Sequence, residues 1–305
     1  GDFAFQGAER FAQLVTEASG GRLHVTAFTA GAITPAGKEF ESTIAGSVEA
    51  SHVSTGWAIG YVPAGVFFTS CVGGLTGNQL KMWLDAEGTA LAKELYRPVG
   101  VEYIEPLTIH PAEIWAHSNK PLNSVADIKG LKIRLGTTAL NVIFERMGAS
   151  PVFLPGGEIY EAMQRGIIDA FEYITPSLNW GMGFNEVAKY LYLGASRSPT
   201  DTQTLFVNKK AWDELPDDLK KIVEIAAHKV GRQFFTDEFL LDQVAIEDFK
   251  KYGTIVDYIP KDIEDLMYEK AFEYYEEEAA KDPDYARVYN SFMEFGKLCR
   301  ESDIK

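Results

Sequence analysis

A helix, a glycine and a short strand occur in this order twice in the sequence. The segment KEFESTIAGSVEA at 38–50 aligns with EIYEAMQRGIIDA at 158–170, and the alignment pairs Gly46 with Gly166. Glycine at the end of a helix can adopt a positive φ, which stops the helix and redirects the chain into a strand. The repeat therefore predicts two similar α/β lobes, although two unrelated helix–turn–strand units could match by chance.

Two such lobes would face each other across a crevice at the ends of their strands, where open α/β sheets bind ligands. The residues after each repeat would form its walls: Ser54, Thr55 and Trp57 on one side, and Phe171, Glu172 and Tyr173 on the other. A carboxylate near the end of an apolar strand, such as Glu172, is costly unless it is paired. Glu172 is expected to bind a cation, a ligand hydroxyl or an arginine, and an internal salt bridge is the plain alternative.

Helical and strand patterns alternate along the chain, which is typical of the α/β class. Strands are expected at 23–28, 48–53, 101–104, 114–116, 131–135, 151–154, 167–173 and 202–208. Helices are expected at 5–19, 40–45, 80–96, 138–147, 158–164 and 176–184, followed by two long helices between 216 and 250 and one from Pro260. A last helix after Pro283 carries an apolar stripe from Tyr285 to Cys299, which would pack on its own chain or on a second copy.

The composition excludes some partners and leaves others open. The formal net charge is −15, which argues against nucleic acid because phosphate binding requires a basic surface. A small anion remains possible, since one local basic group can hold it. No apolar run reaches the roughly 18 residues of a membrane helix. Cys71 and Cys299 are too few for a disulfide framework, so we expect isolated thiols, whose redox state the sequence leaves open.

Arg134 is the strongest candidate for binding an anion. It lies at the end of the alternating segment 131–135 and is followed by Thr137 and Thr138, either of which could cap the next helix. A guanidinium offers a rigid fork of donors that suits a carboxylate, and a helix N-terminus adds a positive dipole end. The alternative is a surface arginine that pairs with an acid. Trp57, Trp115 and Trp180 could wall an apolar pocket, but aromatic residues more often belong to the core.

Patterns that would indicate an enzyme are absent from the sequence. None of the five histidines belongs to an HExxH motif, and the spacing of His110 and His117 in IHPAEIWAH does not suit zinc. Neither a GxSxG nucleophile motif nor a phosphate-binding P-loop occurs. These observations favour a binding protein over an enzyme.

Motifs along nearly the whole chain carry a family resemblance. They are GAERFAQLVTEASGGRLHVTAFTAGAI at 7–33, ADIKGLKIR at 126–134, MGASPVFLPGGEIYEAMQRGIIDAFEY at 147–173, NEVAKYLY at 185–192 and LFVNKKAWDELPDDLKKIV at 205–223. Together they resemble the substrate-binding proteins of tripartite ATP-independent periplasmic (TRAP) transporters of the DctP type. The resemblance implies a two-lobe periplasmic-binding-protein fold of the α/β class, with an interlobe ligand cleft and long C-terminal helices. It also implies capture of an organic carboxylate and delivery to the TRAP membrane permease, without catalysis.

The same resemblance implies a location and a set of lobe boundaries. A periplasmic protein would have lost its signal peptide, and the chain starts at Gly1 without one. The helix at 5–19 has no strand before it, which leaves open whether a first strand is missing. Lobe I is expected at 1–118 and 203–255 and lobe II at 119–202, with the C-terminal helices at 256–305 packing across both.

Within the family, the chain is most similar to the branch that binds 2-oxo acids and related monocarboxylates, often with a cation. The resemblance makes Arg134 the expected carboxylate clamp, and it makes Glu172 and Tyr173 the expected far wall or cation site. Glu113 aligns with the family's glutamine at the bend, and Trp57 lies near its aromatic residue in the first lobe. If a sodium or calcium ion is bound, Glu113 and Glu172 are its expected ligands.

The segment GASRSPTD at 194–201 departs from that branch. Two tryptophans are replaced by Ser196 and Arg197, and a cation-binding glutamate is replaced by Ser198, which puts a metal ion in doubt because cations need several oxygen ligands. Arg197 is expected to offer a second anion contact in an enlarged pocket. A bulky or aromatic carboxylate is therefore favoured, stacked by four aromatic residues: Trp57, Trp115, Phe171 and Tyr173.

Three alternatives to this interpretation stay open. The first is a small 2-oxo acid such as pyruvate, bound with a cation. The second is a sensor that uses the same fold without a permease. The third is an α/β enzyme, for which only Glu113 or Glu172 could serve as a base near Arg134.

Overall fold

The computed structural model describes residues 3–302 and divides the chain into two compact units. Unit 1 consists of Gly1–Thr69, Asn78–Ile109 and Thr202–Asp237, and unit 2 consists of Ser70–Gly77, His110–Asp201 and Glu238–Lys305. The expected boundaries differ from this division, because 70–77, 110–118, 238–255 and 256–305 all belong to unit 2. The reason is strand pairing: the strand at 116–118 joins the sheet of unit 2, as does the strand at 255–258.

Unit 1 is built on a three-stranded sheet of β1 (Ala50–Val53), β8 (Asp201–Asn208) and β2 (Val101–His110), in the order β1-β8-β2. Its helices are α1 (Phe3–Ala18), α2 (Glu39–Ile44), α3 (Gly77–Trp83), α4 (Thr89–Tyr96), α8 (Lys209–Glu214) and the first part of α9 (Asp217–Tyr252). Apolar residues of β2 and β8 pack against α1, α8 and α9 on one face of the sheet, among them Ile104, Leu107, Leu205 and Val207. Tyr103 and Phe206 lie on alternate positions and contact Tyr96, so the strands are buried on both faces.

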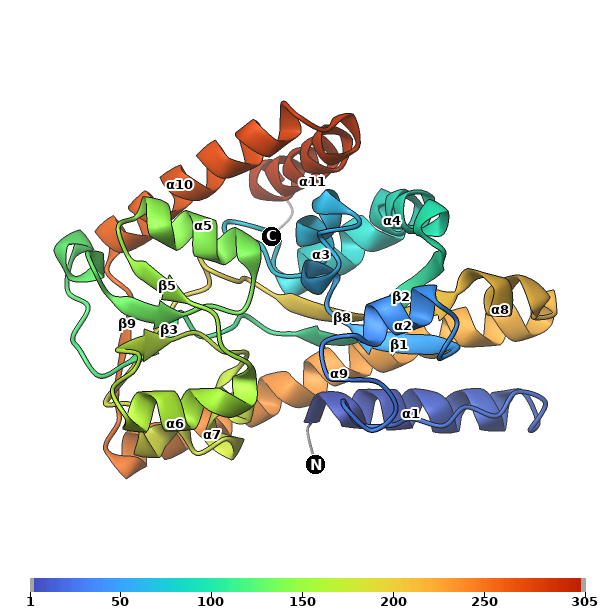
Figure 1. Ribbon diagram of the computed structural model, residues 1–305, viewed down its shortest axis with the longest axis horizontal. Helices are drawn as coiled ribbons and strands as arrows, with labels where there is room; N and C mark the ends of the chain where they lie inside the picture. Colours follow the sequence, from blue (N-terminus) through green and yellow to red (C-terminus); the bar gives the residue numbers. More distant parts are fainter. Residues whose placement is uncertain (1–2, 303–305) are drawn as a thin grey trace. The chain divides into compact units, whose positions relative to one another are not determined.

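Unit 2 is built on a six-stranded sheet in the order β5-β4-β6-β3-β7-β9. The strands are β3 (Ala116–Ser118), β4 (Lys132–Arg134), β5 (Ser150–Val152), β6 (Ala170–Phe171), β7 (Tyr190–Leu193) and β9 (Ile255–Tyr258). The helices are α5 (Thr138–Arg146), α6 (Ile159–Gln164), α7 (Pro176–Gly181), α10 (Lys261–Ala279) and α11 (Pro283–Glu301). Helices α5 and α10 lie on one face of this sheet, and α6 and α7 lie on the other (Figure 1).

The internal repeat appears once in each unit, with matching backbone geometry. Gly46 follows α2 with φ +72°, and Gly166 follows α6 with φ +68°. The amide of Ser47 donates to Ser42 O, and the amide of Ile167 donates to Ala162 O, both at 2.9 Å. Each helix therefore ends in the same glycine cap and leads into a strand, as the sequence predicts.

Three sequence predictions need correction. Residues 23–28 alternate between partly buried and exposed positions, but no strand in the described chain pairs with them. The two helices expected between 216 and 250 are one 36-residue helix, α9. Its Gly231 lies against the carbonyl of Pro106, where a Cβ would come within 2.2 Å, so this glycine allows close packing and does not break the helix. The helix expected at 80–96 is interrupted by a π-helical turn at Leu84–Gly88.

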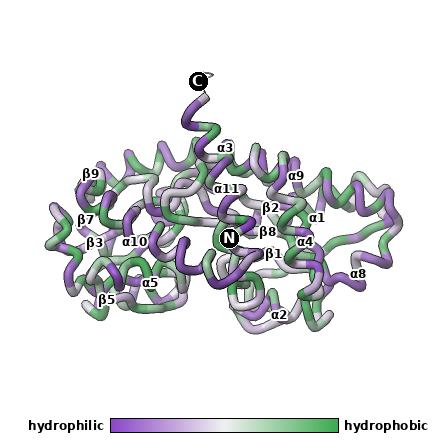
Figure 2. Tube along the Cα trace, turned by 90° about the horizontal axis from the view of Figure 1, so that it is seen from above, coloured by the Kyte–Doolittle hydropathy of each residue, from purple (hydrophilic) through white to green (hydrophobic). Residues whose placement is uncertain are grey.

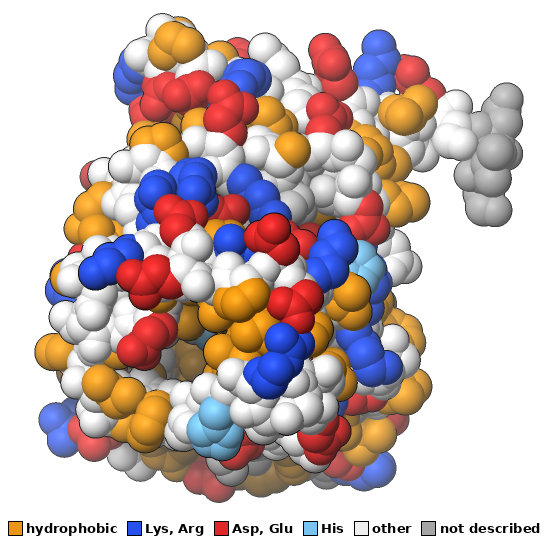
Figure 3. Space-filling model, turned by 90° about the vertical axis from the view of Figure 1, so that its right-hand side faces the viewer, with side chains coloured by type: hydrophobic (Ala, Val, Ile, Leu, Met, Phe, Trp, Pro, Cys, Tyr) orange, Lys and Arg blue, Asp and Glu red, His pale blue; other side chains and the backbone are white. Residues whose placement is uncertain are grey.

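The long helices are amphipathic, and the surface carries charges of both signs. Hydrophobic and hydrophilic residues alternate along α1 and α9 (Figure 2). On the face shown in Figure 3, acidic and basic side chains are intermixed. Across the described residues, every helix is too short or too polar to cross a membrane.

Candidate functional site

The candidate site lies in unit 2, where two neighbouring parallel strands end. Strand β4 ends at Arg134 and pairs in parallel with β6, so that Arg134 lies opposite Phe171. Glu172 follows directly, and its amide donates to Arg134 O at 3.2 Å. The carboxyl ends of adjacent parallel strands are the usual ligand-binding edge of an α/β sheet. The fold therefore brings together the two residues that the sequence singles out.

Arg134 is held by Glu172 and by a main-chain carbonyl. Its Nη1 donates to Glu172 Oε1 at 3.1 Å and to Glu172 O at 2.9 Å, and its Nε donates to Leu154 O at 2.9 Å. Among the described residues, Nη2 has no hydrogen-bond partner, although Arg134 is only 7 % exposed. The guanidinium is thus fixed in orientation and leaves one amino group without a partner in the described chain.

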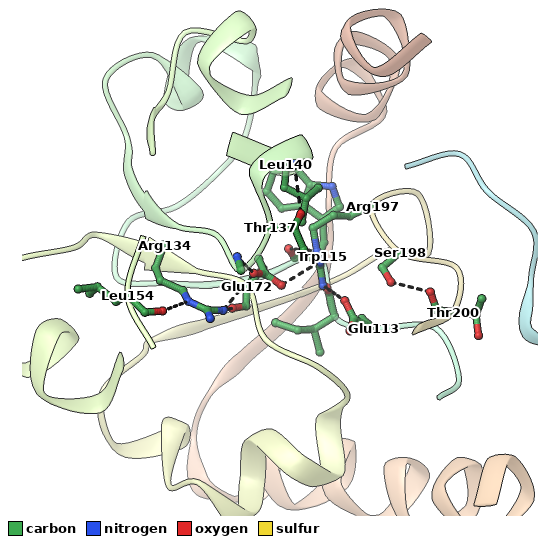
Figure 4. A network of polar contacts seen from close by, with 12 residues as sticks. Glu113, Trp115, Arg134, Thr137, Leu140, Leu154, Glu172, Arg197, Ser198 and Thr200 are labelled. Atoms are coloured by element: carbon green, nitrogen blue, oxygen red, sulfur yellow. Dashed lines mark hydrogen bonds and ion pairs between the residues drawn. The ribbon is translucent and has the colours of Figure 1, made fainter. Parts of the chain in front are cut away.

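Arg197 lies on the other side of Glu172 and is fully buried. Its Nη1 donates to Glu172 Oε2 at 3.0 Å, and its Nη2 donates to Glu113 Oε2 at 2.7 Å. The carbonyl oxygen of Ile114 accepts from Nη2 at 2.7 Å, and those of Ile114 and Trp115 accept from Nε at 3.1 Å. Figure 4 shows the resulting row of four charged residues: Glu113, Arg197, Glu172 and Arg134.

Two further features shape this row. The amide of Gly136 donates to Glu172 Oε1 at 2.5 Å, and a Cβ on Gly136 would come within 3.1 Å of that oxygen. Burial, together with the nearby carboxylates of Asp201 and Glu172, raises the pKa of Glu113 to about 8 against the opposing effect of Arg197. The site therefore needs a glycine beside Arg134, and it holds one carboxyl that accepts a proton readily.

Helix α5 begins next to the site, as expected from the two threonines. The Thr137 hydroxyl is the N-cap and accepts from the Leu140 amide at 3.3 Å. The ring of Tyr173 lies beside Arg134, with 5.7 Å between the guanidinium carbon and the ring centre. A positive helix end and an aromatic face thus border the arginine.

The remaining predicted residues lie elsewhere. Phe171 is fully buried and packs on His117 and Phe184, and Trp115 is fully buried against Phe144. Both are core residues, so the expectation that they stack on a ligand is not met. Trp57 belongs to unit 1 and is 60 % exposed, and its part in a ligand wall stays a prediction.

The role expected for Arg197 also changes. Four of its five N–H groups bond to protein oxygens, so it pairs with glutamates and does not present a second anion contact. Sequence reasoning did not anticipate the parts played by the Gly136 amide and the carbonyls of Ile114 and Leu154. These are main-chain groups, which a residue's identity does not reveal.

A second buried polar group in unit 2 was not anticipated. His110 Nδ1 and Glu238 Oε2 are 2.7 Å apart, and Thr175 donates to Glu238 Oε1 at 2.8 Å. Burial lowers the pKa of His110, but the carboxylate of Glu238 outweighs this effect and raises the pKa to about 9. This group links α9 to the segment before α7 and plays a structural part.

The sequence profile of bacterial extracellular solute-binding protein family 7, the DctP family, matches residues 1–282. The chain belongs to this family. DctP proteins are extracytoplasmic solute-binding components of TRAP transporters and not enzymes.

Relatives show what proteins of this kind bind. A monocarboxylate 2-oxoacid-binding periplasmic protein of Nostoc is 32% identical over 96% of this chain and 80% of its own length. A TRAP solute-binding protein of Bordetella bronchiseptica, solved with calcium and picolinate, is 26% identical with a TM-score of 0.92 over 98% of this chain and 90% of its own. One of Pseudoalteromonas atlantica, with sodium and pyruvate, is 28% identical with a TM-score of 0.91 over 98% and 91%. These matches confirm the α/β fold and the TRAP DctP assignment.

The residues of this chain do not fit the metal ion that these two solved relatives hold. Glu113 and Glu172, the carboxylates expected to ligate a cation, are both bonded to Arg197. The Ser198 hydroxyl donates to Thr200 O at 2.9 Å, so Ser198 contacts this row only through its main-chain carbonyl, which accepts from the Glu113 amide at 3.0 Å. Within residues 3–302, no three His, Cys, Asp or Glu side chains gather as a metal site requires.

Proposed function

We propose that Arg134 binds the carboxylate of the transported solute through its Nη2 amino group. The observation that carries this proposal is that Nη2 has no partner in the described chain, while Nη1 and Nε are held by Glu172 and Leu154. A charge-assisted bond to a carboxylate is strong in a site with little water. Ordering of the arginine before the ligand arrives lowers the entropy cost of binding.

The ligand that we favour is a monocarboxylate with a flat, bulky or aromatic group next to the carboxylate. Tyr173 lies beside Arg134 and offers an aromatic face for such a group. Two of the four aromatic residues first considered, Trp115 and Phe171, belong to the core, so the preference rests on Tyr173 and on the prediction for Trp57. A small 2-oxo acid is the second candidate, and the ligand of the Nostoc relative favours it.

Capture would be followed by delivery to the membrane permease. The chain passes between the units at several points, among them 109/110, 201/202 and 237/238 within α9. A sensor role without a permease would use the same site, and gene neighbours that lack permease subunits would favour it.

The apolar stripe of the last helix does not require a second copy. Tyr285, Val288 and Phe292 of α11 are buried, and Tyr289 lies 6.1 Å from Tyr275 of α10 between ring centres. We propose that the protein works as a monomer, although the Bordetella relative is described as a dimer. Gel filtration with light scattering tests this, and a dimer mass would contradict it.

Calorimetric titration of the refolded, ligand-free protein tests the carboxylate proposal. The panel consists of picolinate, benzoate, pyruvate and a longer 2-oxo acid, with malonate as a dicarboxylate. Tighter binding of picolinate or benzoate than of pyruvate would support the aromatic preference, and the reverse order would support the 2-oxo acid. The proposal fails if Arg134→Lys binds the best of these compounds as wild type does.

A further inference from the structure

Arg197 sits where two carboxylates and two carbonyl groups converge. Glu113 Oε2 and Glu172 Oε2 accept from its guanidinium at 2.7 and 3.0 Å, and the carbonyl oxygens of Ile114 and Trp115 complete the set. Carboxylate and carbonyl oxygens that point to one place are the ligands that sodium and calcium prefer. Here the place is taken by a side chain of the protein. We propose that the Arg197 guanidinium replaces a bound cation, so that this protein captures its carboxylate without a metal ion.

The bonding of the two glutamates supports this substitution. Glu172 uses Oε2 for Arg197, while its Oε1 accepts from Arg134 and from the Gly136 amide. Glu113 directs Oε2 at Arg197. A metal ion could take these oxygens only by displacing a fully buried guanidinium that bonds to one oxygen of each glutamate and to the carbonyl oxygens of Ile114 and Trp115.

Arg197 also helps to fix the orientation of Arg134, the proposed ligand-binding arginine, through Glu172. It fixes Oε2 of Glu172, and the other oxygen of the same carboxylate fixes Nη1 of Arg134. The orientation of Nη2 therefore depends on a positive charge at position 197 even though Arg197 does not touch the ligand. Arg197 is therefore a positioning residue, and its guanidinium supplies the positive charge that a bound cation would supply.

The competing explanation is that Arg197 forms an ordinary buried ion pair with no relation to a cation site. A gain of metal binding on removal of Arg197 distinguishes this explanation from the proposal. Removing the guanidinium leaves Glu113, Glu172 and the carbonyl oxygens around an open space. If that space has the ligands of a cation site, Arg197→Ser will acquire calcium binding that the wild type lacks. A core ion pair would only lose stability.

The first experiment measures thermal unfolding without ligand, in EDTA and then with calcium at roughly 5 mM, above the range of about 0.1 to 1 mM for weak extracellular calcium sites. It is run at about pH 8.5, because alkaline pH favours the ionised form of Glu113, which calcium binding requires. We expect calcium to raise the Tm of Arg197→Ser by about 3 °C or more and to leave wild type and Arg197→Lys unchanged. Arg146→Ser is the control, because Arg146 pairs with Glu277 on the surface of the same unit.

The second experiment titrates wild type with picolinate and with pyruvate. One buffer contains EDTA and choline chloride, and the others contain calcium or sodium chloride. We expect affinities that agree within about twofold, and a loss of about tenfold or more on metal removal would overturn the proposal. A calcium-dependent rise in the Tm of wild type, or no rise in a folded Arg197→Ser, would also overturn it.

This inference rests on the proposed function only for the second experiment. If Arg134 is not the clamp, Arg134→Lys binds as wild type does whatever metal is present. The calcium response of Arg197→Ser needs no ligand, so the two failures are distinguishable. If Arg197→Ser does not fold, the wild-type measurements in EDTA and calcium still decide the question.

Discussion

One amino group of Arg134 is committed to Glu172, and the other is not. Nη1 lies 3.1 Å from Glu172 Oε1 and 2.9 Å from Glu172 O, whereas Nη2 has no partner in the described part of the chain. A guanidinium is planar and rigid, so fixing Nη1 also fixes the direction of Nη2. The pair therefore holds a donor in a fixed direction, as the proposed binding of a carboxylate requires.

Replacing Arg134 with lysine is expected to weaken carboxylate binding by about 2–5 kcal/mol, because the fork geometry and the fixed Nη2 donor are both lost. Calorimetry with picolinate or pyruvate measures the change. Arg146→Lys is the matched control, since Arg146 also pairs with a glutamate of unit 2 but lies at the surface. Equal losses in the two variants would show that the effect does not come from the site.

Gly136→Ala is expected to lower affinity about tenfold while changing the free energy of unfolding by about 1 kcal/mol or less. The new Cβ would lie 3.1 Å from Glu172 Oε1 and 3.4 Å from both amino groups of Arg134, so these groups must shift. Gly181→Ala is the control, because its Cβ would meet nothing within 4 Å. Affinity as in wild type would mean that the ligand does not depend on this geometry.

Arg197→Met is expected to reduce the free energy of unfolding by about 3–5 kcal/mol, because it leaves the buried carboxyl groups of Glu113 and Glu172 without their guanidinium partner. Adding Glu113→Gln should restore part of this loss, since one of the two unpaired carboxyl groups is removed. Urea denaturation of wild type, both single variants and the double variant measures the coupling. If the losses of the two single variants simply add in the double variant, the bond between Arg197 and Glu113 does not contribute to stability.

The stability of the protein is expected to depend on the protonation of Glu113. Its pKa is raised from 4.5 to about 8, so the folded state binds this proton more tightly than the unfolded state does. The resulting stabilisation is complete below pH 4.5 and is lost as the pH rises to about 8. The free energy of unfolding of wild type relative to Glu113→Gln should therefore fall by about 3–4 kcal/mol between pH 5 and 8. A constant or rising difference in urea denaturation would show that Glu113 is ionised throughout.

Local features of the sequence were sufficient to predict the repeat and the position of Arg134 at the end of a strand. The caps at Gly46 and Gly166 are made by bonds that span at most five residues, so their geometry is encoded in the adjacent sequence. Arg134 was identified in the same way, because an arginine at the end of a strand before a capped helix points to an anion. The strands β7 and β9 were missed, and a strand was expected wrongly at 23–28, because an alternating pattern shows a buried face but not a pairing partner.

The sequence by itself determined the family, the α/β class and the two repeats, because these depend on short-range patterns that the chain carries in order. Only the tertiary structure decided what Arg197 does. Its partners Glu113 and Glu172 are 84 and 25 residues away, and its other bonds go to main-chain oxygens. The burial of Trp115 and Phe171 was decided in the same way, since packing depends on which distant segments meet. A charge that resembled a second ligand contact in the sequence is, in the folded protein, the counter-ion of two glutamates.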